Sequence, residues 1–273
     1  MILITGASGF VGGKLMAMGK DVVAAPSLRG WTQESLCRLV EDSGATAIVH
    51  TAAISDIGVC ERDPDASYQA NVLLPVALAK AAKGRKLVCF SSDQVYSGLQ
   101  SEGPYTEETV RPANVYAAHK IEMEQRVLDF DPAAVMLRAQ WMYDYYLKKP
   151  NYFMNMLNAE DTVRASSRQY RGLCYVKEVA ENLEAVLSLP GGSYNFGSET
   201  TRSMFEITRD FLALLGKDVA LEDVPPAHNL WMNCQKAATH GVRFSTVDEA
   251  LLQCAKDHGV NGRGGRGGNL PPA

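Results

Sequence analysis

The sequence predicts an α/β protein with a doubly wound parallel sheet and a small C-terminal lobe, and three observations lead to this fold class. Short apolar runs alternate with longer amphipathic stretches along most of the 273 residues. A glycine-rich segment follows directly after the first apolar run. Later apolar runs end in small or polar residues, as is typical of strands whose carboxyl ends border a ligand site. The length suffices for one large α/β domain with a smaller appendage.

The composition narrows the classes of function. Hydrophobic residues make up 46% of the chain and the formal net charge is −4, so neither nucleic acid nor an anionic membrane is an expected partner. The six cysteines include no Cys-x-x-Cys pair, which argues against a zinc site and against a disulfide framework. No apolar run reaches the roughly 18–20 residues of a membrane span. We therefore expect a cytoplasmic protein without a metal.

The first element is a short buried strand over residues 1–4, which leads into three glycines spaced three apart. Gly6 permits a tight turn, Gly9 lets a pyrophosphate approach the backbone, and Gly12 lets the following helix pack closely on the strand. A Rossmann-type dinucleotide site is the prediction, although the spacing Gly-x-x-Gly-x-x-Gly also occurs in ordinary turns. The residues expected to contact the cofactor here are Gly6, Ser8, Gly9, Phe10, Val11 and Gly12.

The second strand, over residues 21–25, bears on the choice of cofactor. In this fold the end of that strand meets the adenine ribose, where an acid favours NAD and a base accommodates the 2′-phosphate of NADP. The stretch between Val22 and Trp31 contains no acidic residue, but it contains Ser27 and Arg29. NADP(H) is therefore favoured, with NAD(H) as the alternative; Arg29 could equally be a solvated loop residue.

Residues 33–43 form an amphipathic helix, and residues 47–53 form a buried strand that ends in Thr51, Ala52 and Ala53. Side chains this small let a cofactor lie against the backbone. His50, within the same apolar run, is expected to be a packed core residue. A long helix over residues 64–83 carries Asn71 among apolar neighbours, where it either bridges to a catalytic lysine through water or lies on the surface.

The next strand, over residues 86–90, ends at Ser91, Ser92 and Asp93, where the chemistry of a parallel sheet is expected. A helix then runs to about residue 130 and carries Tyr116 and Lys120, which project from one face because they are four residues apart. An ammonium beside a phenol favours the phenolate and lowers the tyrosine pKa from about 10. Such a tyrosine exchanges a proton with a carbonyl oxygen near neutral pH.

These motifs resemble the extended short-chain dehydrogenases/reductases, and within them the dTDP-4-dehydrorhamnose reductase group most of all. The resemblance places a catalytic triad on Ser92, Tyr116 and Lys120, with Ser91, Tyr116 and Lys120 also contacting the cofactor. The family's Leu-Arg-Thr-Ser-Trp-Val-Tyr stretch is matched by residues 137–143, and its Asn-Phe…Met-Leu segment by residues 151–157. The resemblance implies that the protein reduces a nucleotide-linked 4-keto-6-deoxy sugar. It also implies substrate contacts at Asp93, Trp141 and Asn151.

The sequence also departs from the pattern of related enzymes. Sugar-nucleotide dehydratases carry Thr-Asp-Glu where this chain has Ser92-Asp93-Gln94, which counts against dehydration. The reductases usually carry Pro-Thr where this chain has Leu173-Cys174, and Arg-Pro where it has Pro225-Pro226. A sugar-nucleotide epimerase and a non-catalytic NAD(P)-binding regulatory subunit therefore stay as alternatives. The resemblance also allows a homodimer.

We expect a dinucleotide-binding domain over residues 1–145, a substrate-binding lobe over residues 146–260 that returns some segments to the first domain, and a flexible Gly/Arg tail over residues 261–273. Further expected elements are a strand at 135–137, a helix at 176–189, a strand at 193–196, and helices at 203–215 and 246–258. Residues 143–151, rich in Tyr and Lys, are a candidate lid over the substrate. Arg164, Arg168 and Arg171 suit a pyrophosphate, or else form surface salt bridges.

Overall fold

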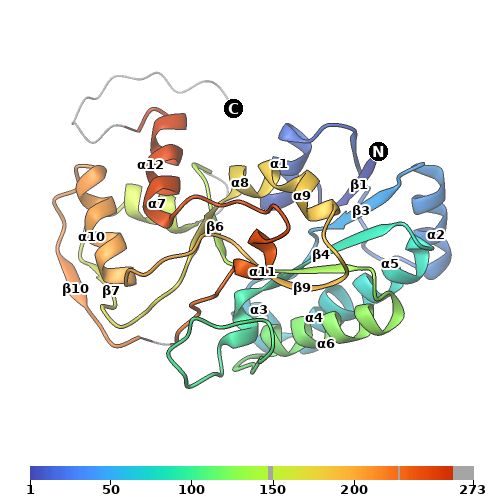
Figure 1. Ribbon diagram of the computed structural model, residues 1–273, viewed down its shortest axis with the longest axis horizontal. Helices are drawn as coiled ribbons and strands as arrows, with labels where there is room; N and C mark the ends of the chain where they lie inside the picture. The colour runs from blue at the N-terminus through green and yellow to red at the C-terminus, as the bar shows by residue number, and fades with distance from the viewer. Residues whose placement is uncertain (147–149, 227, 261–273) are drawn as a thin grey trace.

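The computed structural model describes residues 1–146, 150–226 and 228–260, and its centre is a six-stranded sheet (Figure 1). All its strand pairs are parallel. Their order across the sheet is β2-β1-β3-β4-β5-β9. The strands are β1 (Ile2–Thr5), β2 (Val22–Ala24), β3 (Ala47–His50), β4 (Lys86–Ser92), β5 (Val135–Ala139) and β9 (Gly192–Phe196). The predicted doubly wound fold class is confirmed.

Helices cover both faces of this sheet, and each face has its own apolar core (Figure 1). On one face lie α2 (Gln33–Asp42), α5 (Leu74–Ala82) and α6 (Val115–Phe130), packed on residues such as Leu3 and Ile48. On the other lie α1 (Phe10–Met18), α8 (Val176–Glu181), α9 (Leu183–Leu187) and α11 (Gln235–Ala238). Because both faces of the sheet are covered, the central strands β1 and β3 are mostly apolar, and the sequence shows runs rather than alternation there.

The order of the strands reverses between β1 and β3, because the chain passes from β1 to β2 on one side and then to β3 on the other. In open α/β sheets the ligand lies outside the carboxyl ends of the strands at such a switch point. Gly6 follows β1 and Thr51 follows β3. The topology therefore predicts a ligand site at this edge of the sheet.

Two predicted helices are interrupted. The stretch expected as one helix at 64–83 consists of α4 (Pro64–Tyr68), a π-helical turn η1 (Gln69–Leu73) and α5. The stretch expected at 176–189 breaks at Asn182 into α8 and α9. The Asn182 side chain there donates to the carbonyl oxygens of Glu178 and Arg243. The break at Asn182 involves a contact with Arg243, which is distant in sequence, so helical periodicity did not reveal it.

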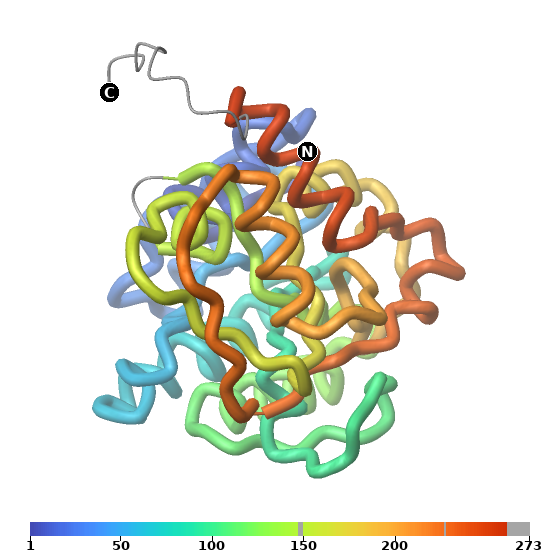
Figure 2. Tube along the Cα trace, turned by 90° about the vertical axis from the view of Figure 1, so that its left-hand side faces the viewer, coloured from blue at the N-terminus to red at the C-terminus, as the bar shows by residue number. Residues whose placement is uncertain are grey.

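Beyond the sheet a smaller lobe is built from α7 (Tyr152–Leu157), α10 (Met204–Leu214) and α12 (Val247–Asp257). Figure 2 looks onto it, with α10 (orange) between α7 (yellow-green) and α12 (red). Two strand pairs complete it, β6 (Trp141–Tyr143) with β8 (Leu173–Tyr175) and β7 (Val163–Ala165) with β10 (Leu221–Asp223). The remaining short helices are α3 (Ile57–Arg62) and the 3₁₀ turn η2 (Asp93–Tyr96).

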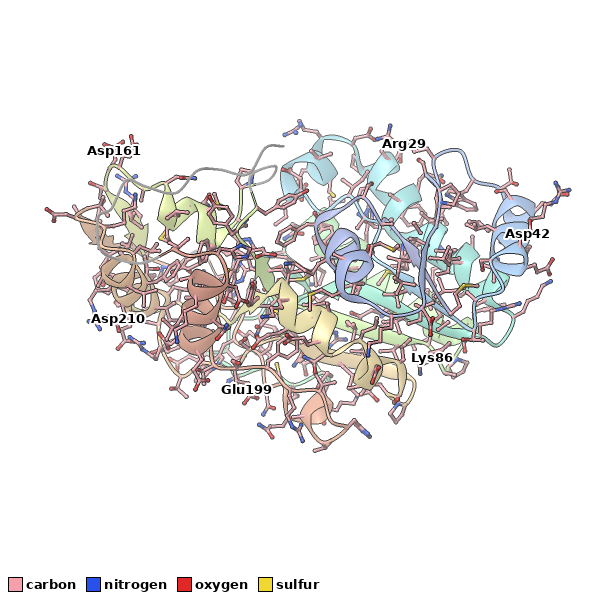
Figure 3. All side chains as sticks on the ribbon, turned by 90° about the horizontal axis from the view of Figure 1, so that it is seen from above. Arg29, Asp42, Lys86, Asp161, Glu199 and Asp210 are labelled. Atoms are coloured by element: carbon pink, nitrogen blue, oxygen red, sulfur yellow. The ribbon has the colours of Figure 1, made fainter. Side chains whose placement is uncertain are left out.

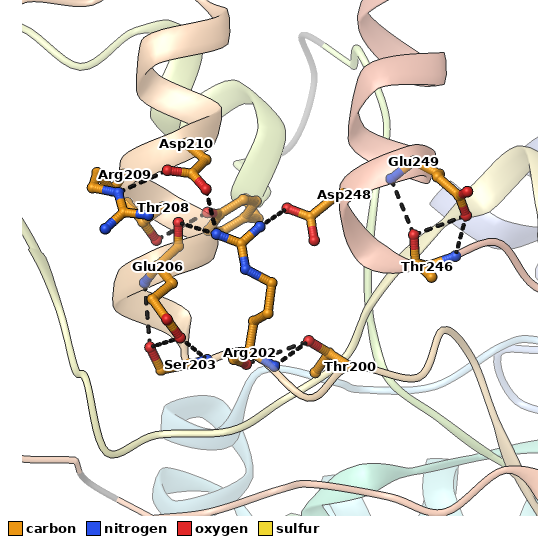
Figure 4. Close-up of polar contacts among 11 residues, drawn as sticks. Thr200, Arg202, Ser203, Glu206, Thr208, Arg209, Asp210, Thr246, Asp248 and Glu249 are labelled. Atoms are coloured by element: carbon orange, nitrogen blue, oxygen red, sulfur yellow. Dashed lines mark hydrogen bonds and ion pairs between the residues drawn. The ribbon is translucent and has the colours of Figure 1, made fainter.

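Polar contacts at helix starts hold the lobe together (Figure 4). The start of α10 has a capping box formed by Ser203 and Glu206, and Thr246 with Glu249 forms another at the start of α12. Arg202 joins the two helices, since its guanidinium donates to Asp248 at 2.6 Å and also contacts Asp210.

The chain crosses between the two regions more than once. After the lobe begins, α8, α9 and β9 return to the sheet, whereas α10 and α12 stay in the lobe (Figure 1). The boundary at residue 145 remains a prediction. The centre of the candidate lid, residues 147–149, and the tail, residues 261–273, lie outside the described residues. Within the described ranges, no helix combines the length and the apolarity that crossing a membrane requires.

Candidate active site

The glycine loop (residues 6–12) is a tight turn whose glycines are required by close backbone contacts. Gly6 has a φ of +70°, and a Cβ there would lie 2.7 Å from the backbone nitrogen of Ala52. A Cβ on Gly12 would lie 2.2 Å from the carbonyl oxygen of Gly6. Gly9 precedes α1 and has no side chain to cap it, so the first amide groups of that helix are open to an anion.

A cavity of about 530 Å³ lies at the switch point and extends towards the lobe. This is within the size range of small-molecule sites. It joins parts of the glycine loop and the ends of β3, β4 and β5 to residues of the lobe. Its lining includes Gly9, Phe10, Val11, Thr51, Ala53, Ser91, Ser92, Asp93, Tyr116, Lys120, Gln140, Trp141, Asn151 and Arg171.

Ser92, Tyr116 and Lys120 all line this one cavity, although they come from two elements. Ser92 is the last residue of β4, and Tyr116 and Lys120 lie one turn apart near the start of α6. The Lys120 ammonium donates to the carbonyl oxygen of Phe90 at 2.7 Å and lies 5.8 Å from the centroid of the Tyr116 ring. The convergence expected from the sequence is therefore present.

The expected lowering of the Tyr116 pKa does not occur. Burial raises the pKa of the Tyr116 phenol well above its usual value. A side-chain hydrogen bond with Ser92 opposes this rise, and the charge of Asp93 adds to it. Tyr116 is thus a neutral phenol, which can donate a proton, rather than a phenolate.

Burial lowers the pKa of Lys120 to about 8, while the nearby Cys89 and Glu124 act in the opposite direction. Lys120 is therefore an ammonium below about pH 8. His50 is fully buried, as expected of a core residue, and its Nδ1 lies 2.7 Å from the Thr5 hydroxyl. Burial and the charge of Lys120 lower the pKa of His50 to about 3, so its imidazole stays neutral.

A buried charge network lies directly behind Ser91. The Ser91 hydroxyl donates to Glu124 at 2.5 Å, and Glu124 forms a salt bridge of 2.7 Å with Arg138. Ser193 also donates to Glu124, and Arg138 donates to the Tyr96 hydroxyl. These groups bind one another across β4, β5, β9 and α6. The network fixes the spacing between the strand that ends at Ser92 and the helix that carries Tyr116.

The far end of the cavity is formed by the residues expected to contact a substrate. Arg171 forms a salt bridge of 2.8 Å with Asp93, and its guanidinium lies 5.2 Å from the centroid of the Trp141 ring. Asn151 accepts from the Met154 amide and so caps α7. Near the cofactor end, Phe10 contacts Tyr146 of the candidate lid edge-on, with ring centroids 5.2 Å apart.

Several other predicted cofactor contacts lie outside the cavity lining. Ala52 packs against Gly6, and Ser8 is exposed on the glycine loop. Ser27 and Arg29 are exposed beyond β2, and Figure 3 shows Arg29 at the periphery of the sheet domain.

Asn71 is buried rather than exposed, but its carboxamide bonds both backbone groups of Ile54. The Asn71 side chain also donates to the Ser67 hydroxyl, so both its nitrogen and its oxygen are hydrogen-bonded. Asn71 therefore anchors the loop that follows β3, and its expected bridge to Lys120 through water remains a prediction. Of the three arginines, Arg164 forms an exposed salt bridge with Glu222, and Arg168 is exposed.

The sequence did not reveal the pairing of Arg171 with Asp93. The pairing joins residues 78 positions apart and left no signal in the sequence.

The doubly wound parallel sheet, with a cavity at the switch point beside a glycine loop, has the architecture of a Rossmann-type fold. The sequence profile described as the RmlD substrate binding domain matches residues 1–262. Because this match spans nearly the whole chain, the protein belongs to that family. The resemblance stated from the motifs is confirmed.

The relatives of the chain include both a reductase and a subunit of a transferase. Over 150 residues it is 32% identical to dTDP-4-dehydrorhamnose reductase of Mycolicibacterium smegmatis, covering 52% of this chain and 46% of that protein. Over 113 residues it is 39% identical to methionine adenosyltransferase 2 subunit beta of Rattus norvegicus, covering 40% of this chain and 33% of that protein. The matched stretch thus spans less than half of either relative.

A solved structure is similar over almost its entire length. It is dTDP-4-dehydrorhamnose reductase of Bacillus anthracis in complex with NADP. It superposes with a TM-score of 0.81 at 20% identity, covering 94% of this chain and 98% of that one. At this identity the likeness establishes the fold.

Proposed function

We propose that this protein reduces the keto group of a nucleotide-linked 4-keto-6-deoxy sugar with NADPH, with NADH as the alternative. The observation that carries the proposal is the meeting of Ser92, Tyr116 and Lys120 in a cavity that begins at the glycine loop. Family membership supports the reaction class, as do the relatives named dTDP-4-dehydrorhamnose reductase. The NADP held by the Bacillus anthracis protein supports the cofactor.

The residues around the glycine loop fit a dinucleotide. The uncapped amide groups at the start of α1 suit its diphosphate, and Thr51 and Ala53 leave room for it beside β3. Arg29 would contact the 2′-phosphate of NADP. When bound, the cofactor supplies the hydride.

The three polar groups have separate roles in this proposal. The Ser92 hydroxyl donates a hydrogen bond to the keto oxygen of the sugar, and the Tyr116 phenol gives its proton to the same oxygen as charge develops there. Lys120 holds the ribose and stabilises the tyrosinate left behind. A raised Tyr116 pKa suits the reductive direction, since the free enzyme holds the proton that the alkoxide needs.

The rate of reduction should fall as pH rises through about 8. Lys120 carries its charge below this pH and loses it above, because burial has lowered its pKa to about 8. The measurement is kcat/KM for the sugar between pH 6 and 10 at constant ionic strength, since this ratio reports groups of the free enzyme. A flat profile from pH 7 to 9.5 would contradict the role given to Lys120.

Replacing Arg29 by Ala should weaken NADPH binding about tenfold and leave NADH binding within twofold, because one charge-assisted hydrogen bond to phosphate is lost. Fluorescence titration of both cofactors measures this. Arg38→Ala is the matched control, since Arg38 is exposed on α2 and pairs with Glu34. Equal weakening of both cofactors by Arg29→Ala would remove the basis for favouring NADP.

Two other functions use the same site. A sugar-nucleotide epimerase would retain its cofactor between cycles, so release of oxidised cofactor in proportion to product separates it from a reductase. A non-catalytic regulatory subunit is suggested by the relative named as a subunit of methionine adenosyltransferase. A screen of NADPH oxidation against 4-keto sugar nucleotides tests the enzyme directly, and absence of turnover together with tight NADPH binding would favour the subunit.

A further inference from the structure

A cluster of three metal-ligating side chains, Asp144, Cys254 and His258, lies outside the candidate active site. Asp144 directly follows β6, Cys254 lies in the last turn of α12, and His258 directly follows that helix. One ligand atom from each residue lies within 4.8 Å of the other two. In the described part of the chain, none of the three lines the active-site cavity. The mechanism proposed above gives this cluster no role.

The two groups from α12 converge on one oxygen of the Asp144 carboxylate. The Nε2 of His258 lies 3.0 Å from Oδ1 of Asp144, and the Sγ of Cys254 lies 3.9 Å from the same oxygen. In a tetrahedral zinc site the bonds to nitrogen, oxygen and sulfur are about 2.0–2.3 Å long, so neighbouring ligand atoms lie about 3.3–3.7 Å apart. The observed distances lie on either side of this separation, so small side-chain shifts would complete the coordination.

Other groups hold the Asp144 carboxylate in place without using all of Oδ1. Lys14 of α1 forms a salt bridge of 2.5 Å with the other oxygen, Oδ2. The Tyr145 amide donates to Oδ1 at 2.9 Å, which leaves that oxygen a second lone pair. Partners of this kind orient the ligating groups of metal sites.

The burial of the cluster provides both a fixed site and a route into it. Asp144 is 4% exposed and Cys254 is fully buried. The side chain of His258 is 29% exposed, so a cation can enter from its side and a water molecule can complete the coordination.

We infer that Asp144, Cys254 and His258 bind Zn²⁺, with water as the fourth ligand. Zn²⁺ accepts a thiolate, an imidazole and a carboxylate, whereas Mg²⁺ and Ca²⁺ require oxygen ligands. The charges of Zn²⁺, thiolate and carboxylate sum to zero, so the bound metal adds no unbalanced charge to a buried site. Because Asp144 and Cys254 are 110 positions apart, the site has no short cysteine motif in the sequence. The inference does not depend on the proposed function.

The test is a titration of chelator-treated, full-length protein with ZnCl₂, followed by calorimetry. Wild-type protein should bind about one Zn²⁺ per chain. His258→Ala, at a partly exposed position, should weaken the binding by at least about 100-fold, because a ligand is lost. Absence of saturable Zn²⁺ binding by wild-type protein, or equal affinity of His258→Ala, would overturn the inference.

Co²⁺ identifies the ligands, because it replaces Zn²⁺ and absorbs light. Wild-type protein should show the d–d bands of four-coordinate Co²⁺ and a charge-transfer band from thiolate to metal, and Cys254→Ala should lack the charge-transfer band. Cys37→Ala is the matched control, since Cys37 is a half-buried cysteine on α2. This variant should keep both the band and the Zn²⁺ affinity. Loss of the band in Cys37→Ala but not in Cys254→Ala would assign the thiolate to the wrong residue and overturn the site.

Thermal unfolding gives a readout that does not require comparison of binding curves. A metal that joins α12 to the residue after β6 stabilises the folded state, so saturating Zn²⁺ should raise the Tm of wild-type protein. It should leave the Tm of His258→Ala unchanged. An equal rise in both proteins would place the bound metal elsewhere and contradict the inference.

Discussion

Replacing Tyr116 by Phe should lower kcat for sugar reduction by a factor of about 10² to 10⁴, the usual contribution of a positioned proton donor. The phenol is a neutral acid because burial raises its pKa, and it lies in the cavity together with Ser92 and Lys120. The ring and its packing are unchanged in the variant, so NADPH should bind within several-fold of wild type. Steady-state kinetics measures the fall in kcat, and a fluorescence titration with NADPH measures the cofactor affinity.

Tyr68→Phe is the control for loss of a tyrosine hydroxyl. Tyr68 lies on α4, and its hydroxyl donates to Glu122 at 2.6 Å away from the cavity. Its substitution should leave kcat within twofold. Near-normal turnover by Tyr116→Phe would refute the assignment of the proton donor, and with it the reductase mechanism.

Replacing Glu124 by Ala should lower the free energy of unfolding by about 3–5 kcal/mol, the typical cost of breaking a buried ion pair by removing one partner. Arg138 is 5% exposed, and its guanidinium would be left without its carboxylate. Ser91 and Ser193 would lose their acceptor as well. Urea denaturation followed by circular dichroism measures the change.

Glu122→Ala is the matched control on the same helix. Glu122 pairs with Arg126 across one turn of α6 and accepts from Tyr68, and the side chains of Glu122 and Arg126 are each 40% exposed. An exposed pair of this kind contributes below about 1 kcal/mol. Equal destabilisation by the two substitutions would show that the buried network does not hold β4 against α6.

The sequence was sufficient wherever neighbours along the chain determine the structure. The glycine loop, the sheet strands and the pairing of Tyr116 with Lys120 on one helical turn follow from local spacing and hydrophobic periodicity. Where a residue's partner is distant in sequence, the sequence predicted its environment wrongly or gave no signal. No local pattern around Asn71 indicates that its carboxamide bonds Ile54. The Tyr116 pKa was expected to fall, but burial raises it.

By itself the sequence determined the fold class, the family and the convergence of Ser92, Tyr116 and Lys120. Local sequence patterns predict these features, because a strand, a glycine turn and a helical repeat each depend on residues close together in the chain. Only the tertiary structure decided the electrostatics and the shape of the cavity. Burial sets the pKa values of Tyr116 and Lys120, and the pairing of Arg171 with Asp93 in the cavity joins residues 78 positions apart. Such desolvation and packing arise from distant parts of the chain coming together.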